Sequence, residues 1–184
     1  MKAPTISGRR NVLLLNCETM MADYQAVDYK LLGAQVDALL RDESDTLANS
    51  ANFVALVFDA LPRINWLGIY VLRHGKLVLG PFQGRPACVR IEIGQGVCGK
   101  AALQMKTVRV ADVHEFGGHI VCDPESKSEI VVPLISDGRL LGVLDIDSPE
   151  AARFNEQDQE GMESLCEVFI KSLESKNSAT PGFI

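Results

Sequence analysis

The sequence predicts a mixed α/β fold of the α+β type, in which about six antiparallel strands form a sheet flanked by helices. The order of patterns is helix, helix, hairpin, strand, short helix, strand, long loop, hairpin, helix. Adjacent strands are joined mainly by hairpins, which favours antiparallel pairing with helices packed against the sheet. Apolar residues make up 47% of the 184 residues and charged residues 23%, which is typical of a globular domain with a real core.

Helical patterns cover four stretches. Apolar residues recur at steps of three to five positions after Asp23, and the last helix carries a clear i, i+3, i+4, i+7 stripe. Pro62 sets the end of the second helix, because proline disfavours helical backbone in the preceding residue. Asn155 is the expected N-cap of the last helix. We therefore expect helices over residues 23–40, 45–61, 97–105 and 155–173.

Six further stretches are rich in β-branched or alternating apolar residues. His74-Gly75 and Asp137-Gly138 favour tight two-residue turns, so two of the connections are expected to be hairpins. We expect strands over residues 65–72, 76–79, 88–93, 107–110, 129–136 and 139–147. The stretch 111–128 has no regular period, and a connection of that length is usually functional.

The domain organisation follows from where these patterns begin and end. Residues 1–22 have no clear period, and we expect them to form a loosely held or poorly ordered N-terminal arm. Residues 23–174 are expected to form one domain, and residues 175–184 a frayed C-terminal tail. From this length we expect no separate output domain.

Composition argues against several functional classes. Apolar runs such as residues 53–58 are far shorter than the roughly 20 residues of a membrane-spanning helix. The net charge is −6 and no basic stripe offsets it, so nucleic acid is not an expected partner. The apolar run after Arg9-Arg10 is too short for a secretory signal. We therefore expect a cytoplasmic protein whose cysteines are reduced.

The chain has five cysteines, and they differ in what their surroundings suggest. Cys166 lies on the apolar stripe of the last helix, where a free cysteine is most simply a small hydrophobic residue. Cys17 lies in the arm with no chemical neighbours in sequence, and we assign it no role. Cys88, Cys98 and Cys122 remain as candidates for chemistry.

A zinc site is one alternative for these cysteines. The soft ligands that it could use are Cys88, Cys98, His114, His119 and Cys122. The gaps between the cysteines are 10 and 24 positions, and no closely spaced pair is present. Structural zinc sites nearly always contain such a pair, so the sequence disfavours zinc.

Thiol redox chemistry is the other alternative. Cys122 follows Gly117-Gly118 in the long loop, where a sulfur could be exposed and the backbone could fit closely around a ligand. Cys98 is expected at a helix N-terminus, where the dipole would lower the pKa of a thiol. Residue types alone do not decide between this chemistry and a structural role.

Three carboxylates favour an acid–base site. Asp145 and Asp147 are two positions apart in a strand, so both side chains emerge on one face with Cα atoms roughly 7 Å apart. If Ser136 faces Arg139 across the turn, residue 130 lies opposite Asp145, which brings Glu129 within reach of both. Crowded carboxylates cannot all ionise, so one should keep a proton, as a general acid must. The alternative is an ordinary solvated strand end.

Three segments together resemble a known family. Residues 119–123 (HIVCD), 128–134 (SEIVVPL) and 142–148 (GVLDIDS) look like the free methionine-(R)-sulfoxide reductases, which are stand-alone GAF-domain enzymes. The resemblance covers about residues 23–174. Three cysteines combined with Asp-x-Asp make it specific, whereas a GAF-like order of elements alone would not.

The resemblance implies a role for each candidate. It implies that Cys122 is the catalytic cysteine, Cys88 the resolving cysteine and Cys98 a third cysteine that can also form a disulfide. The implied active-site carboxylates are Glu129, Asp145 and Asp147. Trp66 and Tyr70 match the aromatic wall of the substrate pocket, although ordinary core packing would explain them equally well.

The implied reaction is the reduction of free L-methionine-(R)-sulfoxide to methionine. A thiol takes the oxygen and becomes a sulfenic acid, a second thiol forms a disulfide with it, and thioredoxin restores the dithiol. No cofactor or metal is expected. A closed pocket under the loop 111–128 would exclude methionine sulfoxide held in a polypeptide.

Two other functions would use the same fold. A non-catalytic GAF domain could sense a small ligand, and a redox-sensing interaction protein could use the same cysteines. GAF domains often pair through their terminal helices, so a homodimer is a further expectation.

Overall fold

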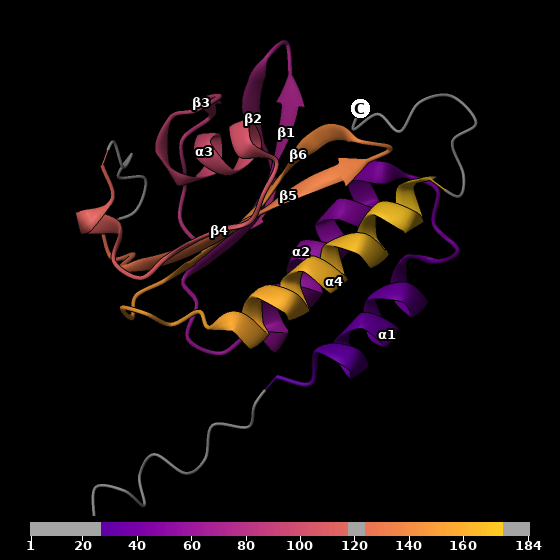
Figure 1. Cartoon of the computed structure of the whole chain (residues 1–184). Coiled ribbons are helices and arrows are strands. Elements are labelled where there is room, and N and C mark those ends of the chain that lie inside the picture. The colour runs from indigo at the N-terminus through magenta and orange to yellow at the C-terminus, as the bar shows by residue number, and fades with distance from the viewer. Residues whose placement is uncertain (1–26, 118–123, 175–184) are drawn as a thin grey trace, which may run out of the picture.

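The computed structural model describes residues 27–117 and 124–174, and these contain a six-stranded antiparallel sheet with four α-helices (Figure 1). In chain order the elements are α1 (Tyr29–Leu40), α2 (Thr46–Ala60), β1 (Trp66–Arg73), β2 (Lys76–Gln83), β3 (Arg90–Glu92), α3 (Gly96–Gln104), β4 (Val108–Val110), a 3-10 turn (Val113–Glu115), β5 (Ser128–Ser136), β6 (Arg139–Ser148) and α4 (Glu156–Glu174). The strand order across the sheet is β3-β2-β1-β6-β5-β4. The predicted fold class is confirmed.

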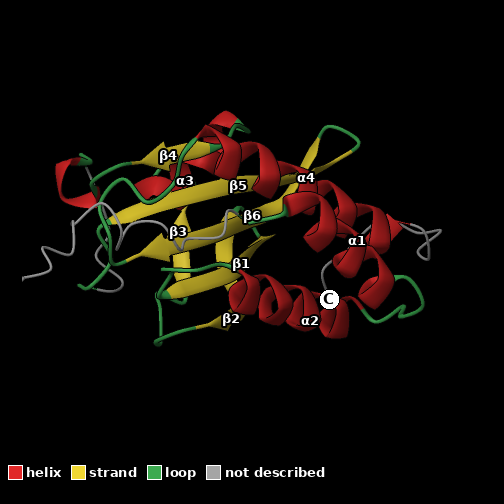
Figure 2. Cartoon of the chain, turned by 90° about the horizontal axis from the view of Figure 1, so that it is seen from below, coloured by secondary structure: helices red, strands yellow, loops and turns green. Residues whose placement is uncertain are grey.

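The helices cover the two faces of the sheet unequally. α2 and α4 pack on one face, and α1 packs on α4 and α2, while α3 covers part of the opposite face (Figures 1 and 2). Each face has its own hydrophobic core. The larger core includes Phe53 and Phe169, whose rings stack with centroids 4.5 Å apart. The smaller core, under α3, contains Trp66, Tyr70 and Cys98.

Side chains cap the helices on the larger side. Asp28 accepts a hydrogen bond from the backbone N–H of Leu31, and Asp45 accepts one from Ala48. The predicted N-cap Asn155 is confirmed, because its side-chain oxygen accepts a hydrogen bond from the backbone of Asp158. The expected start of the first helix at residue 23 was too early: α1 begins after its cap, and residues before 27 lie outside the described part of the chain.

Both predicted hairpin turns are present. His74 and Gly75 have positive φ, as do Asp137 and Gly138, which is the backbone that tight two-residue turns require. β2 continues to Gln83, beyond its expected end at residue 79, because a bulge opposite Ile69 accommodates Pro81.

β3 is shorter than predicted, and Cys88 lies before it. Leu79 still donates its backbone N–H to Val89. The next donor in that ladder would be residue 81, and Pro81 has no N–H. The segment from residue 84 to residue 89 therefore leaves the sheet.

The predicted register of the β5–β6 hairpin was wrong by one residue. A bulge between Leu134 and Ile135 shifts the pairing, so that Ile130 lies opposite Ile146 rather than Asp145. Glu129 is consequently paired directly with Asp147. The predicted register would have turned Glu129 to the face opposite Asp145 and Asp147, so the bulge is what brings the three carboxylates onto one face.

Neither the arm 1–22 nor the tail 175–184 belongs to the described residues, so the predicted boundaries of the domain stay a prediction. Within the described residues, no helix has the length and apolar character needed to cross a membrane.

Candidate active site

Side chains that could carry chemistry meet on the α3 side of the sheet. Antiparallel pairing places Trp66 of β1, Asp147 of β6 and Glu129 of β5 in one row across three strands. Asp145 lies in the next row, opposite Gly68 of β1. Because side chains alternate along a strand, Asp145, Asp147 and Glu129 point to the same face.

The first turn of α3 adds a thiol to these carboxylates. Cys98 Sγ lies 4.0 Å from Glu129 Oε1. The ligand-type atoms of Cys98, Glu129 and Asp145 all lie within 4.8 Å of one another. We call these three residues and Asp147 the acid cluster. Its first three members are buried, with exposed fractions of 4%, 6% and 7%, whereas Asp147 is half-buried.

Burial raises the pKa of the two buried carboxyl groups of this cluster, Glu129 and Asp145. Loss of solvent, together with the charges of Asp145 and Asp147, raises the pKa of Glu129 well above its ordinary value. Burial raises the pKa of Asp145 to about 6, although hydrogen bonds with Cys98 and Glu129 oppose the rise. The expectation that crowded carboxylates retain a proton near neutral pH is therefore supported by the structure.

One oxygen of the Asp145 carboxyl group, Oδ1, is buried and has no hydrogen-bond partner among the described residues. Such an atom is costly unless it is protonated or a ligand supplies a donor.

The predicted lowering of the pKa of Cys98 was wrong. Cys98 does lie in the first turn of a helix. Burial, followed by the charges of Asp145 and Glu129, nevertheless raises the pKa of its thiol well above the ordinary value. Desolvation and two nearby carboxylates outweigh a helix terminus, whose effect is of the order of 1 kcal/mol. Cys98 is thus a neutral thiol at physiological pH.

The two aromatic residues predicted to line the site lie beside this cluster. Trp66 and Tyr70 are buried, and their rings stack with centroids 5.9 Å apart. Trp66 shares its row of the sheet with Asp147 and Glu129. Tyr70 is close enough to the four acidic groups for their charges, after burial itself, to raise the pKa of its hydroxyl. Their role as a substrate wall stays a prediction.

The remaining cysteines separate into different environments. Cys88 is disulfide-bonded, and the other two described cysteines, Cys98 and Cys166, are free. The partner of Cys88 therefore lies outside the described residues, as do Cys122 and Cys17. The structure does not pair Cys98 with Cys88.

The zinc set considered from the sequence is not assembled by the described residues. His114 is exposed on the 3-10 turn, and His119 lies outside the described part of the chain. The described residues that could hold a metal are instead Cys98, Glu129 and Asp145. Their raised pKa values mean that a metal would have to displace protons, so the geometry gives no independent support for one.

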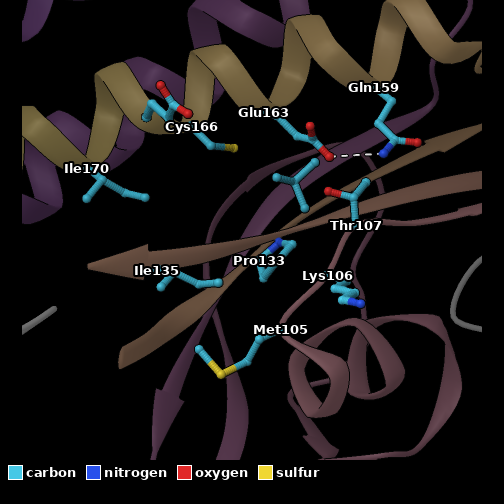
Figure 3. A pocket seen from close by; sticks show the side chains of 11 residues that line it. Met105, Lys106, Thr107, Pro133, Ile135, Gln159, Glu163, Cys166 and Ile170 are labelled. Carbon is cyan, nitrogen blue, oxygen red and sulfur yellow. Dashed lines mark hydrogen bonds between the residues drawn. The ribbon is translucent and has the colours of Figure 1, made fainter. Parts of the chain in front are cut away.

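Cys166 lies away from this site. It is buried on α4 beside a groove of about 550 Å³ between α4 and β5 (Figure 3). Gln159 donates a hydrogen bond to Glu163 on the helix side of the groove. None of the acid cluster lines this groove. The interpretation of Cys166 as a core residue fits its burial.

Two residues of the site were missed in the sequence. A Cβ on Gly68 would lie 2.3 Å from the Trp66 ring, so only glycine lets the indole lie over the strand. Phe82 also stacks on the Trp66 ring, with the two ring centroids 5.6 Å apart. A glycine inside an otherwise β-branched and aromatic strand is a known sign of close approach and could have identified Gly68.

The fold and site agree with comparisons to known proteins. The sequence model of the GAF domain matches residues 19–173. The chain therefore belongs to the GAF domain family.

Individual relatives narrow this assignment. The chain is 48% identical to the free methionine-R-sulfoxide reductase of Escherichia coli, over 79% of this chain and 88% of the relative. It is 46% identical to the protein of the same name in Saccharomyces cerevisiae, over 68% and 73%. A structure of fRMsr of Staphylococcus aureus in complex with substrate superimposes with a TM-score of 0.78 at 48% identity, over 81% and 97%. Within the GAF domains, the chain is a member of the free methionine-R-sulfoxide reductase family.

Proposed function

We propose that this protein reduces free L-methionine-(R)-sulfoxide to L-methionine. The proposal is supported by relatives named for that activity, including the structure of the Neisseria meningitidis enzyme in complex with its substrate, which is 41% identical with a TM-score of 0.80. It is also supported by the residues of the acid cluster, which are present in this chain and come together in space.

The observation that carries the proposal is the buried, proton-retaining pair Glu129 and Asp145. Reduction of a sulfoxide requires its oxygen to be protonated while the S–O bond breaks. A carboxyl group whose pKa is about 6 or higher holds a proton at neutral pH and can donate it. The buried Oδ1 of Asp145, which has no partner among the described residues, could accept a hydrogen bond from a polar ligand.

In this proposal the sulfur chemistry begins at Cys122. Its thiol attacks the sulfoxide sulfur, the oxygen passes to the enzyme, and the products are a thioether and a cysteine sulfenic acid. The Cys88 thiol then displaces water from the sulfenic acid and forms a disulfide. A reduced dithiol of thioredoxin exchanges with that disulfide and regenerates both thiols. The disulfide at Cys88 is consistent with this sequence of steps.

Negative charge around the nucleophile would disfavour a thiolate. The proposal therefore depends on carboxylate-assisted protonation of the sulfoxide more than on a pre-formed thiolate. A free amino acid also carries an ammonium group, which one carboxylate of the cluster can bind by a charge-assisted hydrogen bond. Cys98, as a buried neutral thiol, is a hydrogen-bond donor to the carboxylates rather than a nucleophile.

A redox-sensing protein is the second candidate, because it too would need a reversible disulfide at Cys88. The two functions differ in whether methionine is produced. Either one would require a reducing compartment such as the cytoplasm.

The first prediction tests this function directly. Purified protein is incubated with free methionine-(R)-sulfoxide, thioredoxin, thioredoxin reductase and NADPH, and NADPH consumption is followed. We expect turnover with the (R)-epimer, because the site would hold one configuration at sulfur, and none with methionine sulfoxide inside a peptide. Cys122→Ser should abolish turnover, whereas Cys166→Ser, in the core of α4, should keep it.

The coupling enzymes are checked with a disulfide that thioredoxin is known to reduce. No NADPH consumption in an active coupling system would remove the reductase and leave the redox sensor. Full activity of Cys122→Ser would show that another sulfur is the nucleophile. Light scattering on the same sample tests the expected homodimer.

A further inference from the structure

The segment of residues 84–89, which connects β2 with β3, is attached to the acid side of the sheet by two buried aromatic side chains. Trp66 Nε1 donates a hydrogen bond to the carbonyl oxygen of Arg85, at 3.0 Å. The Tyr70 hydroxyl donates one to the carbonyl oxygen of Cys88, also at 3.0 Å. The side chains of Trp66 and Tyr70 lie on the same face of β1, and each residue is two positions from Gly68, which lies between them.

We propose that Tyr70 is a positioning residue for disulfide formation: its hydroxyl holds the backbone of Cys88 where the Cys88 sulfur reaches its partner, and Trp66 holds the start of the same segment. The inference rests on the proposed function, in which Cys88 resolves a sulfenic acid. It assigns the two aromatic residues a task beyond that of a substrate wall.

Tyr70 is a well-placed donor because its ring is buried and stacked and its hydroxyl stays protonated. The ring is 1% exposed and stacks on Trp66, which in turn stacks on Phe82. Burial and the charges of the acid cluster raise the pKa of the hydroxyl, so it stays protonated. Its hydrogen bond is directed at a backbone carbonyl.

Other contacts also hold this segment. Residues 84–86 are exposed, and Pro81 ends the β2–β3 ladder before it reaches them. Val89 is tied to Leu79 by one backbone hydrogen bond, Arg85 forms an exposed ion pair with Glu125 at 2.9 Å, and Cys88 is disulfide-bonded. The Tyr70 hydrogen bond adds a buried restraint on the backbone of Cys88 that does not depend on its sulfur.

A restraint of this kind matters for the second step and not for the first. Condensation of a cysteine thiol with a sulfenic acid forms the S–S bond, breaks the S–O bond and releases one water molecule, with no other reactant. Its rate depends on how often the two sulfurs meet, and a fixed backbone raises that frequency. In the structure, the Cys88 sulfur is disulfide-bonded, and the Cys88 carbonyl oxygen at the same time accepts a hydrogen bond from the Tyr70 hydroxyl.

The experiment separates the two steps in single-turnover reactions without thioredoxin. Reduced protein is mixed with methionine-(R)-sulfoxide, and samples are quenched at intervals. Methionine is quantified, free thiols are counted, and sulfenic acid is trapped with dimedone and measured by mass. In Tyr70→Phe we expect the rate of disulfide formation to fall roughly three- to tenfold further than the rate of methionine formation, and the dimedone adduct to accumulate, because one hydrogen bond of ordinary strength is lost.

Tyr29→Phe is the matched control. Tyr29, whose ring is half-buried, also donates its hydroxyl to a protein acceptor, Asp158, but it lies on α1, far along the chain from the Cys88 segment. It should lower thermal stability without changing either rate. Gly84→Ala is the second test variant, because an added Cβ would lie 2.6 Å from both the Asn65 carbonyl and the Trp66 ring and would displace the segment without touching Tyr70. It should likewise slow disulfide formation more than methionine formation.

Two results would overturn the inference. One is an unchanged rate of disulfide formation in both Tyr70→Phe and Gly84→Ala. The other is a loss of methionine formation in Tyr70→Phe equal to the loss of disulfide formation, which would assign Tyr70 to substrate binding or chemistry. A parallel series with hydrogen peroxide as oxidant measures disulfide formation independently of the reductase reaction. Failure of the proposed function would therefore not be mistaken for failure of the positioning role.

Discussion

At the scale of single residues, the acid cluster shows how burial turns common side chains into unusual ones. On an exposed strand surface, Asp145 and Glu129 would be ionised at neutral pH. Under α3 they lose solvent and face each other, so at least one proton remains between them at neutral pH. The same surroundings keep the thiol of Cys98 neutral. Glu129 and Asp145 can therefore hold a proton at neutral pH.

Asp145→Asn tests this at one atom. The pKa of Asp145 is raised from an unfolded value near 3.9 to about 6, so the folded protein binds more protons over that interval. Its contribution to stability is full below pH 4 and is lost as pH rises through 6, by up to about 3 kcal/mol. We expect the decrease in Tm between pH 4.5 and pH 7.5 to be smaller in Asp145→Asn than in wild type.

The same variant should lose turnover by about 100-fold, since a general acid is removed. Asp42→Asn, at an exposed position after α1, should reproduce the wild-type pH dependence and activity. An Asp145→Asn protein with the wild-type Tm profile would mean that Asp145 is ionised at low pH in the folded state. Wild-type kcat in Asp145→Asn would return the aspartates to a structural role.

At the scale of elements, β1 positions the aromatic side chains of the site because Gly68 has no side chain. Gly68 lies between Trp66 and Tyr70 on the same face and opposite Asp145. The space over Gly68 is filled by the indole of Trp66, with Phe82 beside it. The indole is therefore held flat against the strand next to the acid cluster.

Gly68→Ala should displace Trp66. The new Cβ would lie 2.3 Å from the indole and 2.6 Å from Cβ of Phe82, so the rings must shift. We expect a loss of about 1–3 kcal/mol in the free energy of unfolding, as in other overpacked cores, and a raised KM. Urea unfolding followed by tryptophan fluorescence measures the stability change, since Trp66 is the single tryptophan of the chain. Steady-state kinetics with free methionine-(R)-sulfoxide measure KM.

Gly33→Ala is the control for this prediction. Gly33 is inside α1, and a Cβ there would meet only Leu165 at an ordinary 3.8 Å. Alanine should stabilise that helix by roughly 0.5–1 kcal/mol without changing KM. Equal stability changes in the two variants would mean that Gly68 has no special spatial role.

At the scale of the whole molecule, one buried ion pair joins α4, α1 and the connections at the base of the sheet. Arg153 binds Asp158 at 2.9 Å, and both side chains are less than 10% exposed. Tyr29 of α1 donates its hydroxyl to the same aspartate, and Arg153 Nε donates to the carbonyl of Pro62. The hydroxyl of Ser128, next to Glu129, accepts a hydrogen bond from the backbone N–H of Arg153. The network therefore connects the outer helix to the strand that carries Glu129.

Asp158→Asn should weaken this network and the whole fold. Removal of one partner leaves the Arg153 charge buried without compensation, which typically costs about 3–5 kcal/mol. We expect the urea midpoint to fall with little change in the activity of the folded protein, because Asp158 lies outside the acid cluster. Glu92→Gln, which breaks the exposed pair with Lys76 at 2.5 Å, should have a much smaller effect. A midpoint no lower in Asp158→Asn than in Glu92→Gln would contradict this account.

Much of this could be predicted from local patterns. The helix cap at Asn155 and both two-residue turns depend on residues within a few positions, and all three predictions were confirmed. Asp145 and Asp147 share one face of β6 in either register, because they are two residues apart. The face of Glu129 could not be predicted in this way: only the bulge after Leu134 places it directly opposite Asp147 and on the same face.

The sequence by itself determined the order of elements, the antiparallel sheet and the family of the chain, because these depend on periodicity, turn residues and short motifs. Only the tertiary structure decided the chemical state of the site. Whether Cys98 is a thiolate or a neutral thiol depends on the solvent that it loses and on carboxylates more than 30 positions away in sequence. The attachment of Cys88 to Tyr70 across 18 positions is decided in the same way. Charge and hydrogen bonding act through space, and no local pattern records which distant groups burial brings together.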